Sequence, residues 1–235
     1  MTRRASHLIR RAAALLLAVA LLPLAAAESP DPDTVISGLQ QTLDSTTDAS
    51  FLVTGELLGG DGTVYRLELE VEAMPQEQLL RIFIIQPDAL ADNFIIVTPE
   101  DLYNYNYLTN QVVLYRADDP NAYGPLAGDA EGSFQLTLDL AELFSGWDAT
   151  VSGEVTTPLG AAVQLELSNS DRDANIAAAT VTALEGDWWP QEIELFTAAG
   201  DTLLRIELSE VQTDTGLSED DLLWYPPDAE LIDER

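Results

Sequence analysis

The sequence predicts a mostly β protein of the α+β class, built on a single curled antiparallel sheet with about two short covering helices. Three observations lead to this fold class. Apolar and polar residues alternate along most of the chain, which is the period of a strand with one buried face. Tight polar turns separate these segments at hairpin spacing. Only two segments show helical spacing, and both are short.

The first predicted element is an amphipathic helix that begins at Asp31. This residue has a favoured N-cap side chain, and the proline after it is favoured at the first helical position. Helical spacing places Val35, Leu39 and Leu43 on one apolar face, which we expect to cover the sheet. The polar cluster at 45–48 ends the helix.

The segments after this helix have the period of strands. In 63–74, Leu67, Leu69 and Val71 share one face while charged residues occupy the other, so one face is buried and the other solvated. The segment 79–86 is apolar on both faces and is therefore central or covered on both sides. The predicted strands are 50–58, 63–74, 79–86, 93–98, 102–107, 111–116, 149–156, 160–168, 176–184, 190–197 and 201–212, with a last short strand at 230–233.

A second covering helix is predicted over 134–145, after a connection at 117–133 that is rich in Asp, Gly, Pro and Ala. Leu140 and Phe144 fit its apolar spacing, and Gly146 follows as a helix stop.

A sheet of ten or eleven strands curls under its own twist, and its apolar inner face needs cover. Two short helices are too small to cover all of it, so we expect an incompletely filled apolar concavity that suits a lipid-like ligand. The alternative is a closed barrel or sandwich with a filled core. The side chains predicted to face this concavity are Leu67, Leu69, Val71, Ile82, Ile84, Tyr103, Tyr105, Val163, Leu165, Ile193, Leu195, Leu204 and Ile206. The lid side chains are Val35, Leu39, Leu43, Leu140 and Phe144.

The first 27 residues are predicted to be a secretory signal peptide. Four arginines lie near its start, an apolar run covers 12–26, and Ala25 to Ala27 fit a signal-peptidase site. The run is shorter than the roughly 20 residues that span a bilayer, although an uncleaved anchor is the alternative. Residues 28–235 then form one domain that works outside the cytoplasm.

Residues 28–235 lack histidine, cysteine and lysine, because the chain has no cysteine or lysine and its one histidine is His7. Ser-His-Asp and Cys-His nucleophiles, Schiff-base lysines and ordinary zinc sites are therefore excluded. We expect no enzyme activity, cofactor or metal; an acid-dependent hydrolase that uses a raised-pKa carboxylate is the minor alternative.

The charge of residues 28–235 is strongly negative, since all 41 acidic residues but only six arginines lie there. Such a surface repels nucleic acid. It indicates either adaptation to a salty exterior or a surface for cations or a basic partner.

Two short motifs imitate known sites. The triplet Asp214-Thr215-Gly216 matches that of aspartic proteases, but it occurs once and no apolar strand leads into it, so a polar turn is expected. Asp171, Asp173 and Asn175 start like a calcium loop, yet Ile176 replaces the required glycine, so a solvated loop is expected.

The order of these parts resembles the LolA-like lipoprotein carriers. The resemblance is carried by the export signal, the first helix, the hairpin before Pro75, and the segments 102–112, 189–193 and 216–229, so it extends over nearly all of residues 28–235. The chain departs from the proteobacterial carriers at Met74, where they tend to place an arginine.

This resemblance implies a half-open barrel that holds acyl chains of a lipoprotein or lipid and moves them across the periplasm towards the outer membrane. It also implies inner- and outer-membrane donor and acceptor proteins, and we expect a monomer. The alternative function is an envelope sensor or adaptor of the same fold that signals through a membrane partner.

Overall fold

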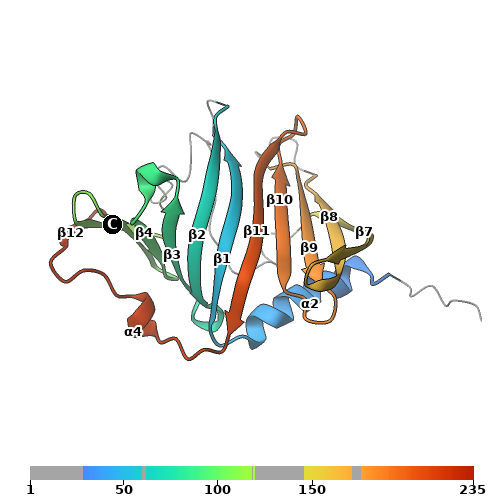
Figure 1. Cartoon of the computed structure of the whole chain (residues 1–235), viewed down its shortest axis with the longest axis horizontal. Helices are drawn as coiled ribbons and strands as arrows, with labels where there is room; N and C mark the ends of the chain where they lie inside the picture. The colour runs from blue at the N-terminus through green and yellow to red at the C-terminus, as the bar shows by residue number, and fades with distance from the viewer. Residues whose placement is uncertain (1–28, 60–61, 118, 120–145, 171–175) are drawn as a thin grey trace, which may run out of the picture.

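The computed structural model describes residues 29–59, 62–117, 119, 146–170 and 176–235, and within them it forms one open sheet of twelve strands (Figure 1). The strand order is β12-β6-β5-β4-β3-β2-β1-β11-β10-β9-β8-β7. The strands are β1 (Ala49–Leu58), β2 (Val64–Met74), β3 (Leu79–Gln86), β4 (Phe94–Val97), β5 (Asp101–Asn106), β6 (Gln111–Arg116), β7 (Asp148–Thr157), β8 (Gly160–Ser168), β9 (Ala178–Leu184), β10 (Pro190–Phe196), β11 (Thr202–Thr213) and β12 (Glu230–Asp233). The predicted fold class is confirmed.

Helix α2 (Pro32–Ser45) starts and ends where the sequence predicts. The Asp31 carboxylate accepts a hydrogen bond of 2.9 Å from the Thr34 amide, which satisfies one of the free donors of the first turn. The Thr46 hydroxyl donates to the Thr42 carbonyl at 2.7 Å in the last turn. Val35 and Leu39 are buried against the sheet, as the helical spacing requires.

The sheet joins its two halves through a pair of strands that are far apart in sequence. β1 and β11 pair antiparallel, although about 150 residues separate them. They approach closely at Gly55, where a Cβ atom would overlap the carbonyl oxygen of Arg205. A residue with a side chain would force these backbones apart, so glycine is needed for the approach that connects β7–β11 with β1–β6.

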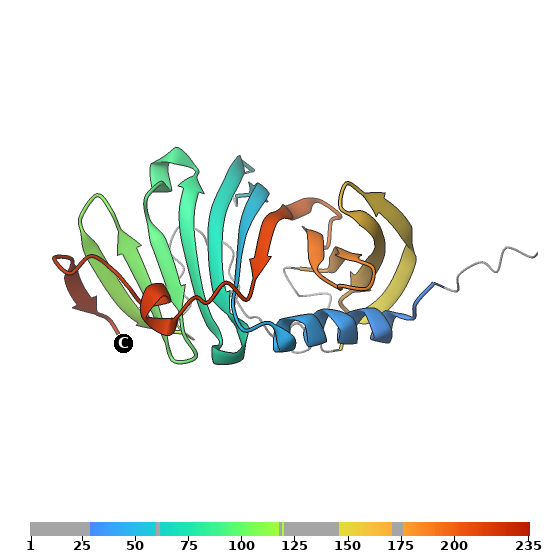
Figure 2. The ribbon, with the colours of Figure 1, turned by 60° about the horizontal axis from the view of Figure 1, so that its bottom comes forward.

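The two halves are covered in different ways (Figure 2). α2 lies across β7 and β8 and packs with the strands from β7 to β11. On the other half, the chain after β11 runs past β2 and β3 to reach β6, and it includes the short helix α4 (Glu219–Leu222). We call residues 214–229 the C-terminal strap.

Three features of this arrangement differ from the sequence prediction or were missed by it. β12 occupies the expected position 230–233 but pairs parallel with β6, because the strap carries the chain along the sheet before it pairs. α4 was not predicted. The 3-10 turns η1 (Pro75–Glu77) and η2 (Asp88–Leu90) join β2 to β3 and β3 to β4. The predicted helix over 134–145 and the predicted signal peptide lie outside the described residues.

Candidate functional site: the apolar inner face

One face of the sheet is apolar from β8 to β3, and the strand register defines it. Residues that pair directly across neighbouring strands lie on the same face. Leu165 pairs with Val181, Val181 with Ile193, Ile193 with Ile206, and Ile206 with Gly55, which in turn pairs with Leu67. Eleven of the thirteen predicted cavity residues share this inner face: Leu67, Leu69, Val71, Ile82, Ile84, Val163, Leu165, Ile193, Leu195, Leu204 and Ile206.

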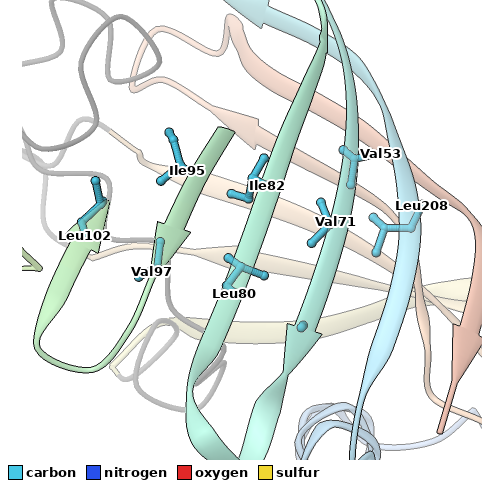
Figure 3. Packing of buried hydrophobic residues seen from close by; sticks show 9 residues of the cluster. Val53, Val71, Leu80, Ile82, Ile95, Val97, Leu102 and Leu208 are labelled. Atoms are coloured by element: carbon cyan, nitrogen blue, oxygen red, sulfur yellow. The ribbon is translucent and has the colours of Figure 1, made fainter. Parts of the chain in front are cut away.

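The ends of the inner face are packed cores. At one end Val35 and Leu39 of α2 pack on Val163 and Leu165, which are all fully or almost fully buried. At the other end Val71, Ile82 and their neighbours form a second buried cluster, whose side chains project to the same side of the sheet (Figure 3). Both cores use side chains that the sequence assigns to the inward face.

Between the two cores lies a set of apolar side chains that are only half-buried. They belong to the central strands β1, β2, β10 and β11, and we call them the inner row: Phe51, Leu57, Leu69, Ile193, Leu204 and Ile206. Gly55 lies between Ile206 and Leu67 in the register and contributes no side chain at that point. Half-buried apolar side chains between buried ones offer surface that a hydrophobic ligand can remove from water.

The opposite, outer face of the same strands is charged. Arg205 makes ion pairs with Glu192 at 2.7 Å and Glu194 at 3.3 Å, and the hydrogen bond to Glu192 is the main cause of its raised pKa. Glu56 pairs with Arg66 and Arg205 in the register. The alternation predicted for these strands is therefore confirmed, and the two faces of the central sheet differ sharply in polarity.

Tyr103 and Tyr105 are placed wrongly by the sequence prediction. Tyr103 pairs with Ile96, whereas Ile82 pairs with Ile95, so the tyrosines and Ile82 face opposite sides. The Tyr105 ring stacks on Phe94 at 4.6 Å, and Tyr103 lies 6.4 Å from the Tyr225 ring of the strap. Burial there raises the pKa of Tyr103. The strap covers the outer face of this half, so aromatic side chains are buried on that face too. An aromatic residue in these strands therefore does not show which face is the inner one.

The structure describes three of the five predicted lid residues. Val35 and Leu39 project from α2 and pack on the sheet, and Leu43 is half-buried. Leu140 and Phe144 lie outside the described residues.

Two contacts that the sequence did not indicate hold α2 to the β9–β10 turn. A Cβ at Gly38 would lie 2.5 Å from the Trp188 ring, and the Thr42 hydroxyl donates to the Asp187 carbonyl at 2.7 Å. Together they fix α2 against the strands it covers.

The strap is anchored by Asp48, a buried carboxylate that the sequence analysis did not single out. It accepts hydrogen bonds from the Thr215 hydroxyl at 2.7 Å, the Thr215 amide at 2.8 Å and the Gly216 amide at 3.0 Å. The Thr215 hydroxyl is the main cause of its lowered pKa. The protease-like triplet at 214–216 is therefore a polar turn, as predicted, and it donates hydrogen bonds to the Asp48 carboxylate. The calcium-like loop lies outside the described residues.

Further along the strap, Arg81 and an apolar cluster hold it to the outer face. The Arg81 guanidinium donates to the Asp221 carbonyl at 3.0 Å and lies over the Phe94 ring at 4.7 Å. Leu222 is fully buried in the cluster that includes Met74. The position where proteobacterial carriers tend to have an arginine is thus filled here by an apolar side chain that packs under the strap.

Two hollows lined by described residues lie away from the inner row. One, of about 350 Å³, lies against α2 and is lined by Asp33, Ser37 and Trp188 among others. The other, of about 900 Å³, lies near Arg116 and Arg235. Arg235 forms ion pairs with Asp101 and Asp233, and it lowers the pKa of Asp233 to about 2. Most of the residues that line both hollows are polar or charged, so neither hollow suits an acyl chain.

The described residues contain no cluster of acidic, histidine or cysteine side chains that could hold a metal ion. Nor do they contain a helix that is long and apolar enough to cross a bilayer.

These features define the class of protein: an open β half-barrel with an apolar inner face and a helix across one end. No family model matches the sequence, and the search of curated proteins found no match. An uncharacterized conserved protein from Thermus thermophilus has a TM-score of 0.61 and 24% identity, covering 86% of this chain and 98% of that one. MucB has a TM-score of 0.55 and 15% identity over 86% of this chain, which spans 65% of MucB.

MucB has also been solved in complex with MucA(peri), and that structure matches at a TM-score of 0.50. A putative outer membrane lipoprotein-sorting protein domain from Vibrio parahaemolyticus matches at a TM-score of 0.46 and 13% identity, over 80% of this chain and 94% of that one. At these identities the likenesses show the fold alone. The chain shares its fold with the Thermus thermophilus protein and with MucB.

Proposed function

We propose that the protein is a periplasmic carrier that binds acyl chains of a lipoprotein or lipid non-covalently and passes them towards the outer membrane. The observation that carries this proposal is the inner row, a half-buried apolar strip between two packed cores. α2 packs on the core at one end of the face, and it leaves Leu69, Leu204 and Ile206 half-exposed. Each methylene that a ligand buries there contributes about 0.8 kcal/mol.

The proposal places the protein outside the cytoplasm, with residues 1–27 as a signal peptide and residues 28–235 as one LolA-like domain that acts as a monomer. Its partners are an acylated lipoprotein or lipid, an inner-membrane donor and an outer-membrane acceptor. It has no enzymatic role, because residues 28–235 lack the histidine, cysteine and lysine that most catalytic centres use. Its acidic surface disfavours nucleic acid.

A displacement assay with N-phenyl-1-naphthylamine, a neutral dye that fluoresces in apolar surroundings, tests lipid binding. The wild-type protein should bind the dye and release it when a monoacylglycerol is added. Leu69→Glu places a charge in the inner row and should weaken dye binding at least tenfold, because the carboxylate would lose its hydration.

The matched control is Leu108→Glu. Leu108 is 85% exposed in the β5–β6 turn, so the same change there should leave dye binding unaltered. Circular dichroism establishes that both variants are folded. A folded Leu69→Glu protein that binds the dye as tightly as the wild type would contradict the proposal.

A sensor or adaptor that signals through a membrane partner is the second candidate. It is favoured by the fold similarity to MucB in its complex with MucA(peri). This function predicts a stoichiometric protein partner and no co-purifying lipid, whereas the carrier predicts a bound acylated molecule.

A further inference from the structure

Trp189 lies at one end of the inner row. It follows the β9–β10 turn and directly precedes β10, at the end of that strand next to α2 (Figure 1). Its carbonyl accepts a hydrogen bond of 3.0 Å from the Leu184 amide. Its ring meets the Phe51 ring edge-to-face, with 6.2 Å between centroids and 76° between planes. Because Phe51 is part of the inner row, the indole contacts that row at its Phe51 end.

The indole nitrogen of Trp189 has no hydrogen-bond acceptor among the described residues. The side chain is 7% exposed, and its Nε1 atom is the single buried side-chain nitrogen or oxygen without a partner in the described part of the chain. A buried N–H without an acceptor costs free energy, and buried tryptophans usually avoid this cost by finding one. A phenylalanine at this position would fill much of the same space and would have no N–H to satisfy. The presence of a tryptophan therefore suggests that a bound ligand supplies the missing acceptor.

We propose that the Trp189 Nε1–H donates a hydrogen bond to the carbonyl oxygen of an acyl ester or amide whose hydrocarbon chain lies along the inner row. This inference rests on the proposed function and names the part of the ligand that the site recognises. From Phe51 to Leu57 the row follows six residue steps of β1, or about 20 Å of extended strand. The carbonyl would lie at the Trp189 end and the chain would extend towards Leu57.

The charge of the protein selects between acyl ligands. Residues 28–235 carry a net charge of −35 (6 − 41), and the indole offers a neutral donor rather than a cation. A fatty-acid carboxylate would be repelled by the surrounding field and would lack a cationic partner at Trp189. A neutral ester or amide keeps the carbonyl acceptor without that charge, so the site should prefer acylated molecules to free fatty acids.

The test compares two lipids with the same chain and headgroup, monopalmitoylglycerol and its ether analogue hexadecylglycerol, which lacks the carbonyl. In the dye displacement assay the wild-type protein should bind the ester about three- to tenfold more tightly than the ether, the range expected of one hydrogen bond. Palmitate should bind more weakly than the ester. Trp189→Phe removes the donor and should make the binding of the ester and the ether equal.

Trp224→Phe is the matched control, because Trp224 lies on the strap and is 54% exposed. This substitution should leave the preference for the ester intact. An ester preference that survives Trp189→Phe would overturn the proposal, as would equal binding of the two lipids by the wild type. Failure of the wild type to bind either lipid or the dye would instead contradict the carrier function itself.

A nuclear magnetic resonance measurement on the wild-type protein keeps the proposal testable if Trp189→Phe does not fold. In protein labelled with ¹⁵N at its four tryptophans, one indole N–H signal should move downfield on adding the ester and much less on adding the ether. Paramagnetic broadening by a spin-labelled fatty ester should affect the same signal most. The proposal is overturned if no indole signal distinguishes the two lipids.

Discussion

The two halves of the sheet are covered on opposite faces. The strands β7–β10 receive α2 on their inner face, where Val163 and Leu165 are fully buried. The strands β2–β6 receive the C-terminal strap on their outer face, where Leu222 is fully buried among Ile96 and Val112. Between these covered regions, on β1, β2, β10 and β11, the side chains of the inner row remain half-buried on the inner face, although Val53 and Leu208 on the same strands are buried.

The difference shows why half-buried apolar side chains gather at the centre of the inner face. A curled sheet whose apolar face is covered along its whole length leaves nothing for a guest. Among the described residues, α2 covers the inner face of one half, and the strap covers the outer face of the other half. The inner row is the interval between the two inner-face cores, and the outer side of the same strands is charged, so only the inner side suits an apolar guest.

The largest predicted effects come from emptying the two covered cores. Leu165→Ala under α2 and Leu222→Ala under the strap should each lower the free energy of unfolding by about 2–5 kcal/mol, through lost burial and a residual cavity. Urea denaturation measures both. Leu204→Ala in the inner row should cost less, because Leu204 is already half-exposed. If Leu222→Ala left the free energy of unfolding unchanged, the strap would not be part of the folded core.

A smaller loss is expected when α2 is pushed off the β9–β10 turn. Gly38→Ala places a methyl group 2.5 Å from the Trp188 ring and should lower the free energy of unfolding by about 1–3 kcal/mol through overpacking. Gly153→Ala is the control, because a Cβ there meets no atom within 4 Å. If both changes cost the same in urea denaturation, the Gly38–Trp188 contact does not hold the helix.

The smallest effect concerns the anchor of the strap and depends on pH. The pKa of Asp48 is lowered in the folded protein, so its contribution to stability is present above the unfolded pKa of about 4. That contribution is lost as pH falls through the lower, folded pKa. Asp48→Asn should therefore lower Tm by a few degrees near pH 7, and the difference from the wild type should shrink below about pH 4.

Thermal melts of Asp48→Asn and of the exposed-site control Asp148→Asn, recorded from neutral to acidic pH, check this sign. A difference between Asp48→Asn and the wild type that grows as pH falls would contradict the assignment of Asp48 as the charged acceptor for Thr215 and Gly216.

The sequence predicts well those elements in which local chemistry and tertiary cover agree. Asp31 and the proline after it mark the start of α2, and alternation along β2, β8, β10 and β11 separates inner from outer residues. Each of these signals lies within one element. Most of the residues that the sequence correctly assigns to the inner face therefore lie on these strands.

The misplaced or missed residues depend on contacts between distant segments. Tyr103 and Tyr105 face the strap, which follows them by about 110 residues, and alternation alone does not reveal a second covered face. Asp48 and Thr215 are 167 residues apart, and the β1–β11 pairing joins the start of the sheet to its penultimate strand in the chain. The orphan N–H of Trp189 becomes visible only when every neighbouring acceptor is placed in space.

Native mass spectrometry of the protein purified from its native cells tests most directly whether the inner row binds an acyl chain. The account predicts one neutral acyl ester or amide bound per protein chain, released by Leu69→Glu and retained by Leu108→Glu. A wild-type protein that carries no acylated molecule, and takes none up when offered monopalmitoylglycerol, would contradict it.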